Sequence, residues 1–266
     1  MAVKKKEQNL KDVKNFIFDL DSTVWHWNKL IPGVKQTIRR LEAKGKDVYY
    51  VTNNSILTRK EFAEKLSDLG LKTEKDNVIC SSYVAAQVFA DKNIDRVYAI
   101  GEKGLLDELG KEHITKSDDA DHVIVGVDRN FSYWKMAKAA EAIRYGAKLW
   151  TTAYGENFRA GDRILPGTGA LLESVKRAAD VEDAELIGKP SDHMTKIIKD
   201  EFPVLTNRTV LIGDHLQTDI VTGNKLGIKT GLVLGGTSKK EDLSDIESIE
   251  RPNFVFKDFK RILRKV

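Results

Sequence analysis

The chain has 266 residues and a formal net charge of +4, and 41% of its residues are hydrophobic while 32% are charged. These proportions are those of an ordinary globular protein, which excludes wholesale disorder, and the length suits one large domain or two moderate ones. The sequence contains no apolar run of membrane-spanning length, its N-terminus lacks the apolar core of a signal peptide, and a single cysteine, Cys80, excludes an internal disulfide.

The small excess of basic residues does not form a nucleic-acid-binding pattern. Lys and Arg are interleaved with nearly as many acidic residues, and local basic runs occur only at Lys4–Lys6 and in the tail from Lys257 to Lys265. We interpret both runs as solvated termini and expect no nucleic acid and no membrane partner. The single cysteine indicates a reducing compartment, which favours a cytoplasmic protein.

Apolar runs typical of strands alternate with helical patterns along the chain. A strand over Phe16–Phe18 precedes a helical pattern from Val34 to Leu41, and a strand over Val48–Val51 precedes a helix with Phe62, Leu66 and Leu69 on its apolar face. Further strands are predicted at Arg96–Ile100, His122–Val127, Lys148–Thr151, Glu185–Ile187, Thr209–Ile212 and Lys229–Leu234. The alternation predicts an α/β fold with mainly parallel sheets.

Four clusters of polar residues share one position, directly after an apolar run. They are Asp19 with Asp21, Thr52 to Ser55, Lys189 in Gly-Lys-Pro, and Asp214 with Asp219. Ligands of open parallel sheets bind outside the carboxyl ends of the strands, so we expect the four clusters to meet in one crevice. Taken singly, each residue has a plainer interpretation as a turn former, a helix cap or a surface lysine, but these readings would have to hold at four strand ends in succession.

The chemistry of the clusters is complementary. Asp19 and Asp214, with a nearby backbone carbonyl, offer the hard oxygen ligands that Mg²⁺ prefers. Lys189 and the Thr52 hydroxyl suit the oxygens of a phosphoryl group. A metal, an anion site and a nucleophile together indicate phosphoryl transfer.

The sequence resembles a known family at these positions. DLDSTVW, TNNS, GKP and GDHLQTD are similar, in this order, to the four motifs of the haloacid dehalogenase superfamily. Within the superfamily the chain is most similar to the p-nitrophenyl phosphatase branch, which includes phosphoglycolate and pyridoxal phosphate phosphatases. Further matches to this branch are Ile31–Gly33, Ser81–Ser82, VGVDRNFSYWKM and LPGTGALL.

The resemblance implies a Rossmann-like, doubly wound parallel-sheet core with an α/β cap inserted between the second and third motifs. The core would comprise residues 1–90 and 184–266, and the cap, which governs substrate specificity, would comprise residues 91–183. Relatives often dimerise through the cap, so a homodimer is also expected.

The resemblance also implies roles for individual residues in a phosphatase of small phosphorylated metabolites or p-nitrophenyl phosphate. Asp19 would be the nucleophile that forms an aspartyl-phosphate, and Asp21 would act as general acid and then as general base. Three residues would bind the phosphoryl group: Thr52, Asn53 and Lys189. Mg²⁺ would be held by Asp19, Asp214 and the backbone carbonyl of Asp21, while Asp219 would orient Lys189 or a metal-bound water.

Two departures from the family pattern bear on these expectations. Ser22 stands where relatives usually have Gly, which predicts a less free backbone after Asp21. Thr152–Gly155 reads Thr-Ala-Tyr-Gly where relatives tend to carry Thr-Asn-Pro-Asp, and this cap loop is expected to meet the substrate. His26, between two tryptophans, is placed in a hairpin after the nucleophile, where substrate contact stays open.

Two other functions are compatible with part of this residue set. A phospho-acceptor signalling domain also uses an acidic pair, an acceptor Asp, a Thr and a Lys, but has no need of a cap. A catalytically degenerate scaffold would not require all the motif residues. Gly167–Gly169 is read as a helix-start turn and not a phosphate loop, and Cys80 as a small apolar core residue.

Overall fold

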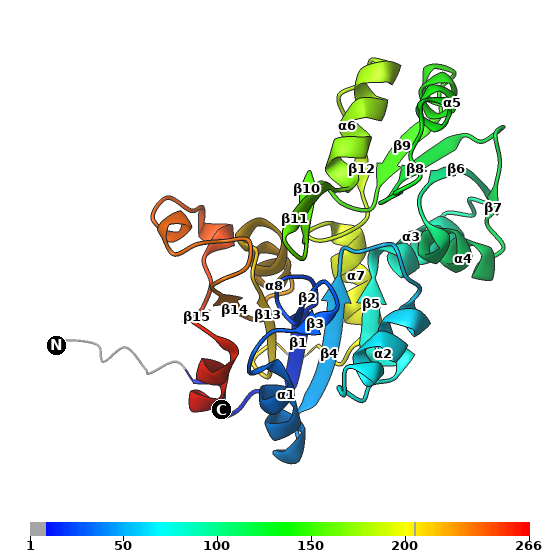
Figure 1. Ribbon diagram of the computed structural model, residues 1–266. Helices are drawn as coiled ribbons and strands as arrows, with labels where there is room; N and C mark the ends of the chain where they lie inside the picture. The colour runs from blue at the N-terminus through cyan, green and yellow to red at the C-terminus, as the bar shows by residue number, and fades with distance from the viewer. Residues whose placement is uncertain (1–8, 205) are drawn as a thin grey trace. The chain divides into compact units, whose positions relative to one another are not determined.

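The computed structural model describes residues 9–204 and 206–266, and these residues form an α/β structure (Figure 1). They fall into two compact units, one made of residues 9–50 with Phe202–Val266, and the other of Val51–Glu201. The boundary after Tyr50 lies within the strand Asp47–Thr52. Among the described residues, no helix has both the length and the apolar character needed to cross a membrane.

The helices and strands keep the alternation expected from the sequence. The α-helices are α1 (Val34–Ala43), α2 (Arg59–Asp68), α3 (Ser81–Asp91), α4 (Lys103–Lys111), α5 (Tyr133–Arg144), α6 (Thr168–Ala179), α7 (Asp192–Glu201) and α8 (Val221–Lys225). The strands are β1 (Asn15–Asp19), β2 (Trp25–His26), β3 (Lys29–Leu30), β4 (Asp47–Thr52), β5 (Val78–Cys80), β6 (Arg96–Ile100), β7 (Thr115–Lys116), β8 (His122–Val125), β9 (Lys148–Thr151), β10 (Asn157–Ala160), β11 (Arg163–Pro166), β12 (Glu185–Leu186), β13 (Thr209–Gly213), β14 (Lys229–Val233) and β15 (Phe254–Phe256).

The larger sheet has the strand order β15-β14-β13-β1-β4-β5. In the first unit, β1 pairs parallel with β13, β13 with β14, and β14 with β15. All five residues of β1 are buried, as are all five of β13, because parallel strands in the middle of a doubly wound sheet are covered on both faces. Burial on both faces explains why the sequences of both strands are nearly continuous apolar runs.

The two faces of β1 are covered by different segments of the first unit. The ring of Phe18 packs 5.6 Å from that of Phe259, which lies in the short 3₁₀-helix η5 (Phe259–Arg264) beside α1. On the other side of the sheet, Leu216 and Ile220 pack with Leu232 of β14. The C-terminal tail is therefore a packed part of this unit, since Phe259 and Ile262 are fully buried, although its basic side chains Lys257, Lys260, Arg261 and Arg264 are exposed. Lys4–Lys6, the other predicted basic terminus, lies outside the described residues.

Local sequence signals explain where the helices begin and end. In α1 the buried positions Val34, Ile38 and Leu41 recur at helical spacing, and the chain leaves the helix through Gly45 at φ +69°. Thr58 begins α2 with a capping box: its side chain accepts from the Glu61 N–H, and the Glu61 carboxylate accepts from the Thr58 N–H.

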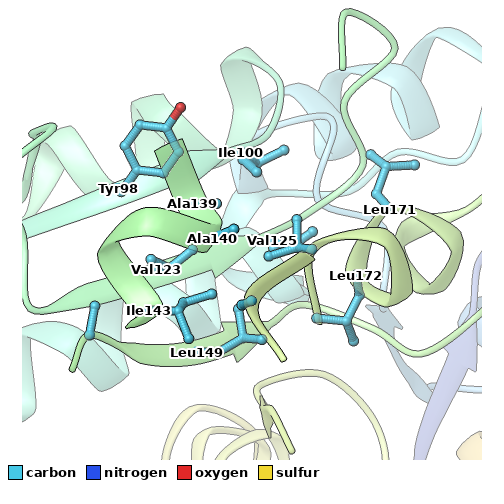
Figure 2. Close-up of a cluster of buried hydrophobic side chains, with 13 residues drawn as sticks. Tyr98, Ile100, Val123, Val125, Ala139, Ala140, Ile143, Leu149, Leu171 and Leu172 are labelled. Atoms are coloured by element: carbon cyan, nitrogen blue, oxygen red, sulfur yellow. The ribbon is translucent and has the colours of Figure 1, made fainter. Parts of the chain in front are cut away.

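The second unit contains a five-stranded sheet with the order β12-β9-β8-β6-β7, in which every neighbouring pair is parallel. Helices α5 and α6 pack on one face of this sheet (Figures 1 and 2). Figure 2 shows Ala139, Ala140 and Ile143 of α5 in contact with the inward side chains of β6, β8 and β9, among them Val123 and Leu149. The opposite face receives α3, where Phe89 packs edge-on against Trp150 at 5.1 Å.

The fold class predicted from the sequence is confirmed. The larger sheet uses strands from residues 15–80 and 209–256, and the other parallel sheet uses strands from residues 96–186. The compact units are divided differently from the predicted core and cap, because α2, β5, α3 and α7 group with the second sheet. The boundaries at 90/91 and 183/184 therefore stay a prediction.

Candidate active site

Three buried carboxylates gather at the ends of two paired strands in the first unit. Asp19 is the last residue of β1, and Asp214 directly follows β13, with Phe18 opposite Ile212 in the parallel register. Asp219 lies one turn further along, in the π-helix η2 (Leu216–Ile220). One oxygen from each carboxylate lies within 4.8 Å of the other two.

These carboxylates are almost inaccessible to water. Asp19 is 6% exposed, Asp214 3% and Asp219 1%. Like charges so close together and so deeply buried repel each other and lose hydration, which is costly unless a cation or protons compensate them. Burial, and then the neighbouring Asp219, raise the pKa of Asp214, and this is partly offset by its hydrogen bonds to Thr237 and Thr23. Carboxylate oxygens in this arrangement form a site for a hard divalent cation.

Hydrogen bonds fix the orientation of Asp214. Its Oδ1 accepts from the Thr23 hydroxyl at 2.8 Å, and its Oδ2 accepts from the Thr237 N–H at 2.5 Å. The backbone carbonyl of Asp214 accepts from the Ser238 N–H at 2.9 Å. The bonds to two residues, Thr23 and Thr237, would be lost if this side chain turned away, so Asp214 is held with its carboxylate toward the cluster.

Glycines allow the backbone to approach the carboxylates closely. A Cβ atom on Gly236 would lie 2.2 Å from Oδ2 of Asp214, and one on Gly213 would lie 2.2 Å from Oδ2 of Asp219. The same Oδ2 of Asp219 accepts from the His215 N–H at 3.1 Å. Both glycines are therefore required by the packing of the site.

Asp21 has a different environment from the three buried carboxylates. It is exposed, and its Oδ1 accepts from the indole N–H of the fully buried Trp25 at 2.9 Å. Between them Ser22 adopts φ +64°, the left-handed conformation that favours glycine, and donates its N–H to the Trp25 carbonyl. The predicted restriction at Ser22 is thus present in the backbone.

The strands β2 and β3 form the hairpin expected after the nucleophile. His26 is exposed in β2, opposite Lys29 of β3. Substrate contact by His26 stays a prediction.

The predicted phosphate-binding residues lie in the second unit. Thr52 ends β4, is 1% exposed, and its hydroxyl accepts from the Asn54 N–H at 3.1 Å. Lys189 is 3% exposed and its ammonium donates to the Val51 carbonyl at 3.2 Å. Asn53 joins the two segments by hydrogen bonds to the backbone of Lys189.

The structure thus brings the predicted site residues together in two sets. Asp19, Asp214 and Asp219 form one set in the first unit, with Asp21 and its Trp25 partner in the same unit, and Thr52, Asn53 and Lys189 form the other in the second unit.

Sequence reasoning missed the residues that support Asp214. Thr23 occurs only as one residue of the motif DLDSTVW, and Thr237 and Ser238 lie outside the four motifs. One signal could have indicated the last two: they follow Gly235-Gly236 just after β14, the neighbour of β13 in the sheet, and a polar turn at a parallel strand end is where a ligand-binding loop is expected.

The sequence interpretations of Gly167–Gly169 and of Cys80 agree with the structure. Gly167 is the N-cap of α6, so Gly167–Gly169 begins a helix. Cys80 is fully buried, and burial raises the pKa of its thiol to about 11, which makes it an unreactive core residue. In the cap loop, Thr152 is buried, whereas Tyr154 is 51% exposed and donates its hydroxyl proton to the Ala184 carbonyl at 2.6 Å.

Comparisons with known proteins agree with this geometry. A family model described as haloacid dehalogenase-like hydrolase matches residues 16–115, and a second, related hydrolase model matches residues 186–262. A phosphoglycolate phosphatase of Arabidopsis thaliana (1A, chloroplastic) is 32% identical over 93% of this chain and 76% of its own length. The glycerol-3-phosphate phosphatase of Rattus norvegicus is 31% identical over 93% of this chain and 86% of its own.

Among solved structures, a 4-nitrophenylphosphatase from Thermotoga maritima superposes with a TM-score of 0.87 at 26% identity, covering 96% of this chain and 98% of its own. The chain belongs to the haloacid dehalogenase-like hydrolases, in the branch of the p-nitrophenyl phosphatases and phosphoglycolate phosphatases.

Proposed function

We propose that this protein is a Mg²⁺-dependent phosphatase that hydrolyses monoesters of small phosphorylated metabolites through an aspartyl-phosphate on Asp19. The observation that carries the proposal is the buried cluster of Asp19, Asp214 and Asp219 at the ends of β1 and β13. The named substrates of the similar proteins, phosphoglycolate, glycerol 3-phosphate and 4-nitrophenyl phosphate, are all small phosphate monoesters.

The residues present fit a magnesium ion. Their carboxylate oxygens are hard ligands, and the burial that raises the pKa of Asp214 gives a cation a large electrostatic advantage. Asp19, Asp214 and the backbone carbonyl of Asp21 would hold the ion, with Asp219 close enough to join them or to orient a bound water. When bound, the ion would offset the negative charge of the carboxylates and of the phosphoryl oxygens.

The two aspartates of the first motif divide the chemistry. A carboxylate oxygen of Asp19 attacks phosphorus, the bond between phosphorus and the ester oxygen breaks, and Asp21 gives a proton to the leaving oxygen. Water then attacks phosphorus of the aspartyl-phosphate while Asp21 takes up its proton, which releases phosphate and restores Asp19. The difference in exposure supports this division, because Asp19 is buried and Asp21 is open to solvent on one side and held by Trp25 on the other.

Thr52, Asn53 and Lys189 bind the phosphoryl group in this proposal. The Thr52 hydroxyl, the backbone N–H groups of the turn after β4 and the Lys189 ammonium supply donors and one positive charge. Support comes from the burial of Thr52 and Lys189, which is unusual for a surface turn and a surface lysine.

The domain organisation and location follow the same family pattern. We place the catalytic core in residues 1–90 and 184–266 and the specificity cap in residues 91–183, and we place the protein in the cytoplasm. The separate parallel sheet of residues 96–186 supports an inserted cap.

A homodimer formed through the cap is also proposed, with α5 as the contact. Trp134 and Tyr145 are 73% and 87% exposed, and they lie eleven positions apart, which puts them on one face of the helix. Lys138, whose ammonium also pairs with Asp118 in the same chain, and Glu141 lie between them on that face, at equal distances from its centre. A two-fold, antiparallel pairing of α5 with its copy would set Trp134 against Tyr145 and Lys138 against Glu141. This face of α5 is therefore complementary to itself in charge and in apolar area.

The dimer is tested by measuring molar mass with size-exclusion chromatography and light scattering. Trp134→Asp and Glu141→Lys should each give monomers, and Glu141→Lys combined with Lys138→Glu should restore the dimer. A wild-type monomer at micromolar concentration would contradict the proposal.

The phosphatase proposal is tested by phosphate release from p-nitrophenyl phosphate and from a panel of phosphoglycolate, sugar phosphates, nucleotides and pyridoxal phosphate. Activity should require Mg²⁺ and disappear in EDTA, and Asp19→Asn should abolish it without unfolding the protein. Undiminished hydrolysis in EDTA would contradict this mechanism.

A further inference from the structure

Both polar atoms of the Asn53 side chain bond the backbone of a residue far away in the sequence. Its Oδ1 accepts from the Lys189 N–H at 2.6 Å, and its Nδ2 donates to the Lys189 carbonyl at 3.0 Å. An amide is the side chain that can bond both the donor and the acceptor of one peptide residue. The two bonds form a clamp across 136 residues of chain between the loop after β4 and the turn before α7.

The backbone of Asn53 is itself held in place. Its carbonyl accepts from the hydroxyl of Ser81 at 2.6 Å, and Ser81 is the buried first residue of α3. The clamp is therefore attached to the end of β4 on one side and to the start of α3 on the other. Because Asn53 is fixed at both its backbone and its side chain, it leaves the backbone of Lys189 little freedom to move.

The residue before Lys189 is shaped for this contact. A Cβ atom on Gly188 would lie 2.6 Å from Oδ1 of Asn53 and 2.2 Å from the carbonyl oxygen of Thr152. The chain at Gly188 thus passes directly against the amide of Asn53, which any larger residue would displace.

The side chain of Lys189 contacts β4, the strand that directly precedes Asn53. Its ammonium donates to the carbonyl of Val51 at 3.2 Å, two residues before Asn53. Asn53 fixes the backbone of Lys189, and the Val51 carbonyl fixes one N–H of its ammonium. The end of β4, which also carries Thr52, therefore anchors this charge.

We propose that Asn53 is a positioning residue: its side chain sets the place of the Lys189 ammonium through the backbone clamp and does not contact the substrate. The inference rests on the proposed function, in which Lys189 binds the phosphoryl group. It assigns the side chain of Asn53 a role different from direct phosphate binding, because both of its hydrogen-bonding groups are used by Lys189. Its backbone N–H is not part of this inference.

The test compares Asn53 variants in two backgrounds, with wild-type Lys189 and with Lys189→Ala. Asn53→Ala removes both bonds, and Asn53→Asp keeps volume and the acceptor for the Lys189 N–H but sets an oxygen against the Lys189 carbonyl. With Lys189 present, Asn53→Ala should lower kcat/KM for p-nitrophenyl phosphate about tenfold to a hundredfold, since a displacement of about 1 Å can cost about a hundredfold. Asn53→Asp should give a smaller loss, and the inhibition constant of inorganic phosphate should rise in parallel.

In the Lys189→Ala background, adding Asn53→Ala should change kcat/KM by less than about twofold, because an effect exerted only through Lys189 vanishes with it. Asn207→Ala, at an exposed turn, is the matched control and should be neutral in both backgrounds. Melting temperatures and circular dichroism identify any variant that fails to fold. If Asn53→Ala does not fold, Asn53→Asp is compared in the two backgrounds in its place.

Two results would overturn the inference alone: equal losses from Asn53→Ala in both backgrounds, or a wild-type kcat/KM for Asn53→Ala in the presence of Lys189 although Lys189→Ala alone is impaired. A Lys189→Ala enzyme with wild-type kcat/KM would overturn this inference and, with it, the role of Lys189 in the proposed function.

Discussion

At the scale of single residues, environment separates side chains of the same chemical type. Asp19 and Asp214 lie buried with a third carboxylate, whereas Asp21 is exposed and held by one indole N–H. A buried anion near a cation suits nucleophilic attack, and an accessible carboxylate suits exchange of protons with the leaving group and water. Two aspartates separated by one residue can therefore have distinct roles.

The role of Asp21 predicts a dependence on the leaving group. Asp21→Asn should slow aspartyl-phosphate formation from an alkyl phosphate such as phosphoglycolate much more than from p-nitrophenyl phosphate, because p-nitrophenolate departs without a proton. Single-turnover, rapid-quench measurements are needed, since the second step, which also uses Asp21, is common to all substrates. Equal slowing for both leaving groups would make Asp21 a positioning residue.

The left-handed backbone at Ser22 predicts an effect on stability. A non-glycine residue at φ +64° costs about 1–2 kcal/mol, and glycine loses about 0.5–1 kcal/mol more conformational entropy on folding. Ser22→Gly should therefore raise the free energy of unfolding by about 0.5–1 kcal/mol, measured by denaturant titration. The control, Ser174→Gly within α6, should lower it, and a loss of stability at Ser22 would show that its side chain makes a necessary contact.

At the scale of elements, the ends of strands and the turns after them carry the candidate site. Asp19 ends β1 and Asp214 directly follows its parallel neighbour β13, while Thr52 ends β4 and Asn53 directly follows it. The cap loop of Thr152–Gly155 also follows a strand, β9. There Gly169 donates its N–H to the Gly155 carbonyl at 2.8 Å, so the loop is packed on the start of α6.

This placement predicts that the cap loop affects selectivity and not the chemical step. Tyr154→Ala should change the ranking of kcat/KM across the substrate panel while altering the rate on p-nitrophenyl phosphate little, because the reacting groups lie on other strands. Val255→Ala, an exposed apolar residue of β15, is the control. Equal losses on every substrate would mean that the loop only supports the fold.

Much of this organisation could be predicted from the sequence because it depends on local patterns. The strand at Arg96–Ile100 and that at Lys148–Thr151 have the bounds expected from their apolar runs, and α1 begins at the first apolar residue of its pattern. The strand predicted over His122–Val127 ends earlier, at Val125, although Gly126 still donates its N–H to the Ile100 carbonyl of β6 at 2.7 Å.

Other features depend on contacts between distant segments and leave no local pattern. The Thr23–Asp214 hydrogen bond joins residues 191 positions apart, and the Asn53–Lys189 clamp joins residues 136 apart. The grouping of α3 and α7 with the second sheet depends on packing such as that of Phe89 on Trp150. Neither spacing nor composition encodes such pairings in a single sequence.

At the scale of the whole molecule, the carboxylate cluster should link metal binding to stability. Without a cation, three buried carboxylates oppose folding of the first unit, and a bound cation removes this cost. Mg²⁺ at about 100 times its dissociation constant should stabilise the protein by about 2.7 kcal/mol, or about 5–10 °C in melting temperature.

Differential scanning fluorimetry with and without Mg²⁺ measures this effect. Asp214→Asn should melt no lower than the metal-free wild type, since it removes one of the repelling charges, and should lose most of the response to Mg²⁺. Two results would contradict the assignment of the metal site: a wild-type melting temperature that Mg²⁺ does not raise, or an Asp214→Asn melting temperature that Mg²⁺ raises as much as that of the wild type.

The central claim is that Asp19 forms a short-lived aspartyl-phosphate. The most direct measurement is acid-quenched mass spectrometry of the protein during turnover of p-nitrophenyl phosphate with Mg²⁺, followed by mapping of the labelled peptide. We predict a single phosphoryl group on Asp19 that decays at least as fast as kcat and is absent from Asp19→Asn. A phosphoryl group that outlives turnover would indicate a signalling acceptor, and a protein that never becomes labelled, or is labelled elsewhere, would contradict the mechanism.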